Sequence, residues 1–382
     1  MAAPTVVVFL GGMGGSPIEE MMGRALRAAA LDSLEAALGT GAFAGAVLVT
    51  DDPSLANDVG PGVMVDVDRP STGSGPGFHF GRRLREVIER YGIERVLYFG
   101  AGAVPLLTAD EFAALAAQLS RSERAVIANN FFSGDLVGFV PAGALTTIEP
   151  PASDNALPRL LRDAGLDNQL LPRTTATQLN LDSPGDLAIL ALQGGGGLRL
   201  SRLVQSLCLD LSNYRRCLPY LTDPAAEVVV AGRMGSQVWQ YLERETACRV
   251  RVFSEERGMQ AAGRHLTGEA RSMLGYHLEA VGMVRFFEEL ATLGDAAFID
   301  TRVLLAHPSL RSGQDPPSRA DRFLSDLGRF EEIEDPFLHQ FTEAATGAPV
   351  PVVLGGHSLV SGGLMALIEA AWREHDRAVD AR

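Results

Sequence analysis

The sequence is short of cysteine and of basic residues, and both shortages exclude classes of protein. Its three cysteines, Cys208, Cys217 and Cys248, form no CxxC pair, which argues against a disulfide framework or a cysteine-based zinc site. Buried free thiols are the expectation instead. The 33 lysines and arginines face 47 aspartates and glutamates, which gives a net charge of −14. Because nucleic-acid-binding faces are basic, we expect no nucleic-acid partner.

Long apolar runs are also missing. No window approaches the roughly 18 uninterrupted apolar residues of a membrane span, so we expect no membrane partner. The N-terminal sequence MAAPTVVVFLGG has no basic region, and its apolar run has the length of a strand. These features argue against a signal peptide and favour a cytoplasmic protein.

What is present is the composition of a globular protein. The chain has 382 residues, of which 46% are hydrophobic and 21% charged. At roughly 150 residues per domain, this length predicts two domains. The glycine-rich segment at 193–197 is the best linker in the chain. We therefore expect a first domain at 1–192, a linker at 193–198 and a second domain at 199–382.

Short β-branched runs alternate with capped, amphipathic segments in both halves. The pattern predicts strands at 5–10, 46–50, 63–67, 95–100, 125–129, 136–141, 227–232, 249–254 and 349–356. It predicts helices at 17–31, 32–38, 81–91, 109–119, 158–164, 184–192, 199–209, 213–220, 238–245, 268–293 and 359–372. The segment 57–77, apart from its one short strand, and the segment 308–319 are expected to be loops, and 296–306 partly a strand. Such alternation predicts an α/β fold, with a mostly parallel sheet flanked by helices and a second α/β domain.

A glycine-rich loop follows the first strand. It consists of Gly11, Gly12, Met13, Gly14, Gly15 and Ser16. Glycines let backbone N–H groups approach a phosphate, and the helix that follows offers further donors. The loop lacks the GK[ST] of a Walker A motif, and a plain strand-to-helix turn would need only one or two glycines.

A second candidate lies before the helix expected at 184. Asn180 and Asp182 are alternate residues of an extended segment, so both side chains could face one site. A carboxylate there could bind Mg²⁺ on a nucleotide. The alternative is that Asp182 and Ser183 only cap the helix.

The order of three segments carries a family resemblance. These segments are VVVFLGGMGGS near the N-terminus, Val104 to Thr108, and Asn180 to Leu187. They resemble the GT-A-like nucleotidyltransferases, in particular the guanylyltransferases of molybdenum-cofactor and 2-phospho-lactate (coenzyme F420) biosynthesis, over about residues 4–192. The resemblance implies a nucleotide-diphospho-sugar-transferase-like fold, Mg²⁺ held by Asn180 and Asp182, and a nucleotide at the glycine loop and Arg24. It also implies attack of a phosphate on the α-phosphorus of an NTP.

Two features depart from that family. The first basic residue after the glycine loop is Arg24, and the segment 100–104 before Pro105 has no carboxylate for a metal. Asp51, Asp52 or Asp135 could substitute for the missing acid. The pair Asn129 and Asn130 could read a base or sugar, or form an Asx turn.

The second half has two glycine-rich turns of its own. Gly232, Arg233, Gly235 and Ser236 join a strand to a helix, where Arg233 could pair with a phosphate. Glu255 and Glu256 follow the next strand, about where a ribose-binding acid would lie. The second turn holds Gly356, His357 and Ser358; it lacks the final glycine of a hydrolase nucleophile elbow, so we expect ligand contacts rather than a catalytic serine. An ordinary turn is the alternative for both.

Three functions follow from these features. The first is Mg²⁺-dependent nucleotidyl transfer to a phosphorylated small molecule. The second is binding of a nucleotide or sugar phosphate by a catalytically degenerate relative. The third is a dinucleotide-binding function of the second domain. A small-molecule phosphate or nucleotide is the expected partner in each case, and a homodimer is an additional expectation.

Overall fold

The computed structural model describes residues 2–68, 78–311 and 315–381. By internal contacts the chain forms two compact units, and each is described by itself. The first unit comprises 1–14, 23–178 and 196–203, and the second comprises 15–22, 179–195 and 204–382. Residues 179–192, expected in the first domain, are thus counted with the second unit. The domain limits at 192 and 199, as limits of independently folding parts, stay a prediction.

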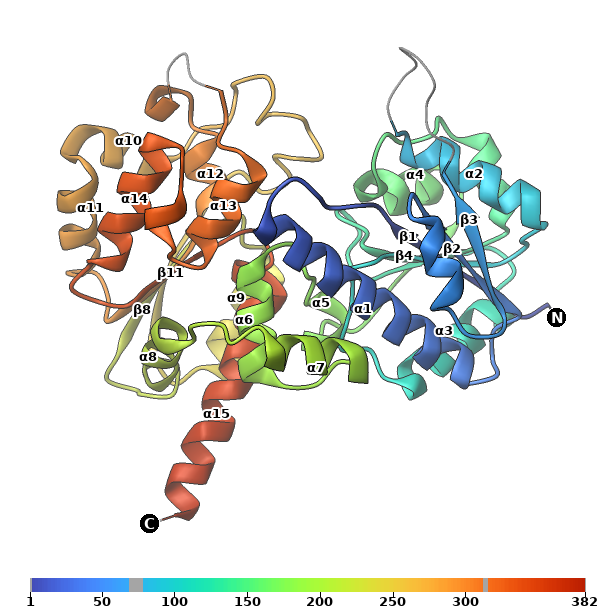
Figure 1. The fold of residues 1–382 in the computed structure, drawn as a ribbon, viewed down its shortest axis with the longest axis horizontal. Coiled ribbons are helices and arrows are strands. Elements are labelled where there is room, and N and C mark those ends of the chain that lie inside the picture. Colours follow the sequence, from blue (N-terminus) through green and yellow to red (C-terminus); the bar gives the residue numbers. More distant parts are fainter. Residues whose placement is uncertain (1, 69–77, 312–314, 382) are drawn as a thin grey trace. The chain divides into compact units, whose positions relative to one another are not determined.

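The first unit is built on a seven-stranded sheet (Figure 1). Its order is β3-β2-β1-β4-β6-β5-β7, and only β6 runs antiparallel to its neighbours. This confirms the expected mostly parallel α/β fold, although β7 was not expected because it is short and polar. The strands are β1 (Thr5–Leu10), β2 (Gly45–Thr50), β3 (Val63–Val67), β4 (Val96–Gly100), β5 (Ala125–Ala128), β6 (Leu136–Val140) and β7 (Asp167–Leu170).

Helices cover both faces of this sheet. Phe80 and Leu84 of α2 share a core with Val7 and Tyr98 of the sheet. Phe139 belongs to the same core, so its neighbour Gly138 faces the other side, where a Cβ would lie 3.0 Å from Leu119 of α3. The helices are α1 (Pro17–Gly39), α2 (Phe80–Tyr91), α3 (Ala109–Arg121), α4 (Leu157–Asp163), α5 (Thr175–Gln178) and α7 (Leu198–Ser206), of which α1 and α7 extend partly into the second unit.

The helix α1 corrects one expectation. The sequence predicted two helices, at 17–31 and 32–38, but α1 is continuous from Pro17 to Gly39. Asp32 instead accepts hydrogen bonds from the backbone of Arg199 (3.2 Å) and Leu200 (2.8 Å). Its carboxylate therefore caps α7, which lies far away in the sequence.

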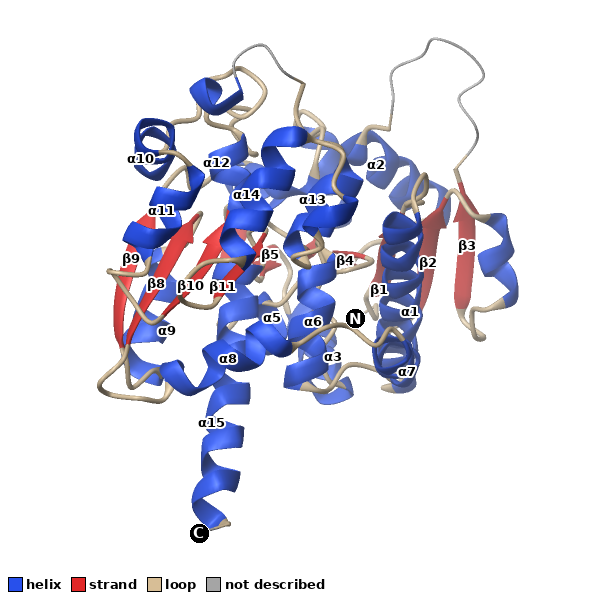
Figure 2. Ribbon diagram, turned by 60° about the vertical axis from the view of Figure 1, so that its left-hand side comes forward, coloured by secondary structure: helices blue, strands red, loops and turns tan. Residues whose placement is uncertain are grey.

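The second unit holds a four-stranded sheet in the order β11-β10-β8-β9, with every pair parallel (Figure 2). The strands are β8 (Glu227–Gly232), β9 (Arg249–Ser254), β10 (Ala296–Asp300) and β11 (Val352–Gly355). The helices are α6 (Pro184–Gln193), α8 (Ser212–Leu221), α9 (Ser236–Glu245), α10 (Met273–Val281), α11 (Met283–Leu290), α12 (Thr301–Leu305), α13 (Arg319–Asp326), α14 (Pro336–Thr346) and α15 (Leu364–Asp380). The expected second α/β domain is therefore present as a sheet with helices.

Several local expectations for this unit were wrong. The helix expected at 268–293 is two helices, because Gly282 adopts a φ of 79° between them. Met273 is 71% exposed, and Cys208 is exposed rather than buried. Two helices, α13 and α14, lie where no helix was expected. Parts of the loops expected at 57–77 and 308–319 fall outside the described residues.

Among the described residues, no helix combines the length and the apolar character that crossing a bilayer requires.

Candidate functional site

In the first unit, the chain direction across the sheet reverses between β1 and β4. From β1 the chain proceeds outward to β2 and β3, and it then returns to form β4 on the other side of β1. Ligands of open α/β sheets bind at such a switch point, outside the carboxyl ends of the strands. Here those ends are Leu10, which leads into Gly11 and Gly12, and Gly100.

A cavity of about 1090 Å³ opens at this place. Its wall contains residues from β1, β4, α2 and the segment that precedes α4. They are Phe9, Leu10, Gly11, Gly12, Val49, Asp51, Val67, Asp68, Phe78, His79, Phe80, Arg82, Arg83, Glu86, Arg90, Tyr98, Ala152, Ser153 and Asp154. A concave site of this size, with apolar walls and a few polar groups, is typical of a small-molecule pocket.

One wall of the cavity is aromatic. The Phe9 ring meets the rings of Phe78, Phe80 and Tyr98 edge to face, with centroids 6.1, 5.6 and 5.4 Å away. Phe78 is 66% exposed, whereas Phe80 and Tyr98 are buried. Phe78 therefore presents an accessible ring on a rigid aromatic base.

The arginines of α2 differ in their pairing. The Arg83 guanidinium contacts Asp68 (2.6 Å) and Asp66 (3.1 Å), and Arg90 contacts Asp66. Burial lowers the pKa of Arg83, but these two carboxylates outweigh burial and raise it. Arg82 is exposed, lines the cavity and has no hydrogen-bond or ion-pair partner in the described part of the chain. Arg82 is therefore the cation that is available to a ligand.

Three further polar side chains line the wall, those of Tyr98, Asp154 and His79. The Tyr98 hydroxyl donates a hydrogen bond to Asp154 (2.9 Å), and burial raises the pKa of both groups. The Nδ1 atom of His79 is buried and has no partner in the described part of the chain. A buried polar atom without a partner is uncommon and is typical of a site that a ligand completes.

Only the first part of the glycine loop lines the cavity. Gly11 and Gly12 line the cavity, and the Gly12 N–H donates to Asp51 (3.0 Å). Met13 is half-buried and Gly14 exposed, while Gly15 and Ser16 are counted with the second unit. There the Ser16 hydroxyl donates to Glu19 (2.9 Å) and accepts its backbone N–H. Ser16 thus serves as a helix cap, and Arg24, exposed on α1, does not line the cavity.

Asn129 and Asn130 have structural roles. Asn129 is buried, accepts the N–H of Leu136 (3.1 Å) and donates to the carbonyl of Thr177 (3.0 Å). Asn130 accepts the N–H of Phe132 (3.1 Å), which is an Asx turn. Of the two readings left open by the sequence, the turn is the one observed.

The expected magnesium ligands belong to the second unit. Asn180 and Asp182 precede α6, where the Asp186 carboxylate accepts the N–H groups of Asp182 (2.9 Å) and Ser183 (2.8 Å). Burial and the neighbouring Asp182 carboxylate raise the pKa of Asp186 to about 8. Across the described ranges, no group of three or more His, Cys, Asp or Glu side chains could hold a metal.

The second sheet has its own switch point, between β8 and β10. Gly232 ends β8 with a φ of 131°, and a Cβ there would lie 2.3 Å from that of Asp300. This close approach lets Arg233 form a buried two-point ion pair with Asp300, at 2.6 and 3.0 Å. Burial raises the pKa of Asp300, but the charge and hydrogen bonds of Arg233, together with the charges of His357 and Arg302, outweigh burial and lower it. Arg233, expected to pair with a phosphate, is therefore committed to Asp300.

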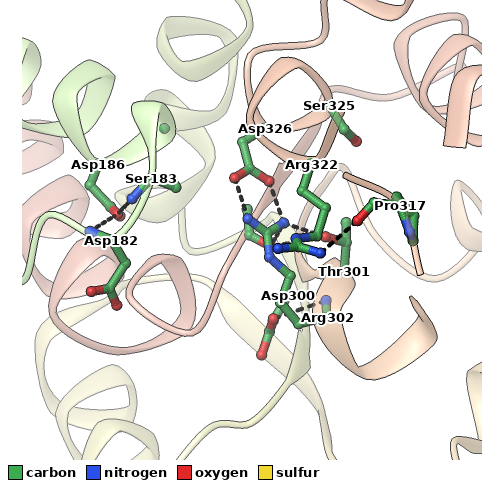
Figure 3. A network of polar contacts seen from close by, with 12 residues as sticks. Asp182, Ser183, Asp186, Asp300, Thr301, Arg302, Pro317, Arg322, Ser325 and Asp326 are labelled. Atoms are coloured by element: carbon green, nitrogen blue, oxygen red, sulfur yellow. Dashed lines mark hydrogen bonds and ion pairs between the residues drawn. The ribbon is translucent and has the colours of Figure 1, made fainter. Parts of the chain in front are cut away.

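Sequence reasoning missed a second ion pair at this edge. Arg302 follows β10, and its Nη1 and Nη2 atoms each donate to the Asp326 carboxylate of α13 at 2.6 Å (Figure 3). The same region contains Arg322 of α13 (Figure 3). No sequence signal identified these residues, because no element was predicted from the sequence for 320–326, where most of α13 lies.

The other expected residues of this unit lie around the same edge. Burial and the Arg233 charge lower the pKa of His357 to about 4, so its imidazole is neutral at pH 7. Ser358 donates to the carbonyl of Asn180 (2.8 Å). A Cβ at Gly356 would lie 3.8 Å from the Arg302 guanidinium. A Cβ at Gly235 would lie 3.6 Å from the Arg257 guanidinium. Ser236 begins α9.

The two acids expected to bind a ribose are engaged elsewhere. Glu255 accepts from the Ser272 hydroxyl (2.5 Å) and the Met273 N–H (2.6 Å). Glu256 forms a two-point ion pair with Arg264, both distances being 2.9 Å. These contacts give both carboxylates a structural role.

The chain matches no protein-family model and no curated protein sequence. Solved structures similar to it include a provisionally named nucleotide-diphospho-sugar transferase from Desulfovibrio desulfuricans G20, with a TM-score of 0.41 and 16% identity over 54% of this chain and 95% of that one. A cytidylyltransferase from Leptospira borgpetersenii has a TM-score of 0.38 and 12% identity over 54% and 94%. CMP:2-keto-3-deoxy-manno-octonic acid synthetase, complexed with CTP, has a TM-score of 0.35 and 15% identity over 49% and 95%. Likenesses of this size cover about half the chain and establish neither a family, nor the guanylyltransferase type, nor a reaction.

Proposed function

We propose that the first unit binds a nucleoside triphosphate in the cavity at the carboxyl ends of β1 and β4, as the donor site of a nucleotidyltransferase-like protein. The observation that carries the proposal is that one cavity beside Gly11 and Gly12 holds an accessible aromatic ring, Phe78, and a cation, Arg82, that forms no ion pair with any described residue.

The aromatic wall supports a base. Nucleobases stack on aromatic rings, and such a contact contributes about 1–3 kcal/mol per base. Phe78 offers its exposed ring for this contact, and Phe9 holds that ring from the side. The Tyr98 and Asp154 pair adds polar atoms that could orient a base or ribose.

The phosphate groups require positive charge and free N–H groups. Arg82 supplies a guanidinium that pairs with no carboxylate in the described part of the chain. Gly11 lies on the cavity wall and leaves the backbone open, because no atom lies within 4 Å of its Cβ position. Such an open backbone lets a phosphate approach closely.

Binding is tested by calorimetry with the four NTPs on the full-length chain. We expect Arg82→Gln to weaken binding by about tenfold, as loss of a charge-assisted contact does. Phe78→Ala should weaken it to a similar extent through lost stacking. The matched control is Arg121→Gln, an exposed arginine at the end of α3 that does not line the cavity. Absence of binding by any NTP, or unchanged affinity in both cavity variants, would refute the proposal.

Transfer of the nucleotidyl group to a phosphorylated small molecule is a second candidate, favoured by Asp51. The carboxylate lies at the Gly12 N–H, where a triphosphate would arrive, and two anions repel unless a cation lies between them. A nucleotide-borne Mg²⁺ needs only one or two protein carboxylates, because phosphates and water supply the other ligands. Asp51 fits that role, and the ion would neutralise charge on the phosphates.

The transfer candidate is tested by Mg²⁺-dependent release of pyrophosphate from an NTP. We expect Asp51→Asn to abolish release while Asp110→Asn, an exposed acid of α3, leaves it unchanged. If the chain binds an NTP tightly but releases no pyrophosphate with any of a panel of phosphorylated acceptors, nucleotidyl transfer is refuted and NTP binding alone remains.

A further inference from the structure

We propose that the second unit binds the phosphate group of a small molecule through Arg302 and Arg322, at the carboxyl edge of its own sheet. This site is independent of the nucleotide cavity of the first unit. The ligand class is a phosphate ester, recognised by two guanidinium groups.

Arg322 has donors that the protein does not use. Its guanidinium is half-buried, and Nη1 donates to the carbonyl of Pro317 at 2.7 Å (Figure 3). A guanidinium has five N–H donors, so most remain unused within the described part of the chain. Burying a cation without an anion is unfavourable, which indicates a partner that is not part of the chain.

The carboxylates near Arg322 are committed to other groups. The Asp326 carboxylate accepts hydrogen bonds from Nη1 and Nη2 of Arg302, each at 2.6 Å. The Asp321 carboxylate accepts hydrogen bonds from the Ser318 hydroxyl and from the backbone N–H of Glu334, each at 2.9 Å. Neither acid forms an ion pair with Arg322, so its charge is not neutralised by direct contact.

Arg302 completes the site. Asp326 fixes its guanidinium in one orientation, and 15% of the side chain remains exposed. Burial and the Arg302 charge both lower the pKa of Arg322, which shows that the two cations repel each other. An anion between two guanidinium groups relieves that repulsion, and planar guanidinium forks match phosphate oxygens.

The place in the fold agrees with a ligand site. Arg302 follows the carboxyl end of β10, a strand at the switch point of the second sheet. Gly356, after the adjacent strand β11, has no side chain to cover the Arg302 guanidinium.

The test uses inorganic phosphate and calorimetry on the full-length chain that carries Arg82→Gln, so that the first unit contributes little. We expect saturable phosphate binding that Arg322→Gln weakens by about tenfold, consistent with a charge-assisted contact. Arg285→Gln, an exposed arginine of α11 in the same unit, should change the affinity less than twofold. Succinate, a carboxylate dianion, should bind more weakly than phosphate.

Equal phosphate affinity with and without Arg322→Gln would overturn the proposal, and so would tighter binding of succinate. If the variant does not fold, phenylglyoxal labelling of the unaltered chain replaces it. Phosphate should then slow the labelling of Arg322 but not that of Arg285, and equal rates at both arginines would overturn the proposal. Failure of NTP binding would leave this result unaffected, because the readout belongs to α12 and α13.

Discussion

At the scale of single residues, the second unit concentrates charge where charge is expensive. Asp300 and Asp326, which pair with Arg233 and Arg302, are both nearly inaccessible to water. A buried ion pair contributes little net stability, because desolvation offsets the attraction between its charges. A charged network at the carboxyl ends of strands is therefore more readily explained by ligand binding than by stability.

Asp186 predicts a pH dependence of stability. Burial and Asp182 raise its pKa from 3.8 to about 8, so the folded chain holds one more proton than the unfolded chain between these values. This contribution to the free energy of unfolding is fully present below pH 3.8 and is lost as the pH rises towards 8. From pH 5 to 8, the unaltered chain should lose up to about 1.4 kcal/mol per pH unit relative to Asp186→Asn.

Urea denaturation at each pH measures this difference. His357 acts in the opposite sense, since its pKa near 4 removes stability as the pH falls from 6.5. Comparison of the two chains cancels that effect, because both contain His357. Parallel stability curves for the two chains would show that Asp186 is ionised in the folded protein.

The Arg233 and Asp300 pair predicts a large effect of a small change. Asp300→Asn leaves the Arg233 guanidinium buried without its counter-ion, which costs about 3–5 kcal/mol of unfolding free energy. The control is Glu245→Gln, which removes an exposed pair with Arg244 and should cost less than about 1 kcal/mol. Similar urea midpoints for the two variants would contradict the buried pairing.

At the scale of elements, capping side chains and a glycine with positive φ determine where the helices begin and end. The sequence signature of Thr108 and Glu111 located the start of α3, because both halves of a capping box are local. The cap of α7 was missed for the opposite reason: it is supplied by Asp32, far away in the sequence, and no local pattern reveals it. Gly282 lay inside an apolar helical pattern, yet its positive φ separates α10 from α11.

Asp32→Ala tests that long-range cap. Loss of the carboxylate leaves the N–H groups of Arg199 and Leu200 without acceptors, which should cost about 1–2 kcal/mol of unfolding free energy. Glu35→Ala removes only an exposed contact with Arg199 and should cost less than about 1 kcal/mol. A loss for Asp32→Ala no greater than that for Glu35→Ala would disprove the capping role.

At the scale of the whole molecule, the chain passes repeatedly between its two units. The segment 179–195 shows why a domain boundary at 192 is unfavourable: a cut there would separate buried side chains from their core. Leu187 and Ile189 of α6 are fully buried, and Ile189 belongs to the core that includes Val360 and Leu364. A fragment that ends at 192 would expose these apolar side chains.

We predict that fragment 1–192 aggregates and binds the dye ANS, whereas the full-length chain does not. Exposed apolar surface of this kind drives association. In the fragment, Ile189→Ser should improve solubility, while in the full-length chain it should lower stability by leaving a cavity. A soluble, cooperatively unfolding fragment 1–192 would instead confirm the expected domain limit.

The sequence by itself determined most of the strands, most helix starts and the α/β class, because alternation, capping and β-branching act over a few residues. It also identified Gly11 and Gly12, which do lie at a switch point. Only the tertiary structure decided which charges are free. Arg233 pairs with Asp300, a residue 67 positions away, whereas Arg82 and Arg322 form no ion pair with an acid among the described residues. Charge pairing across the fold depends on strand order and register, and no local pattern encodes which acid each arginine will meet.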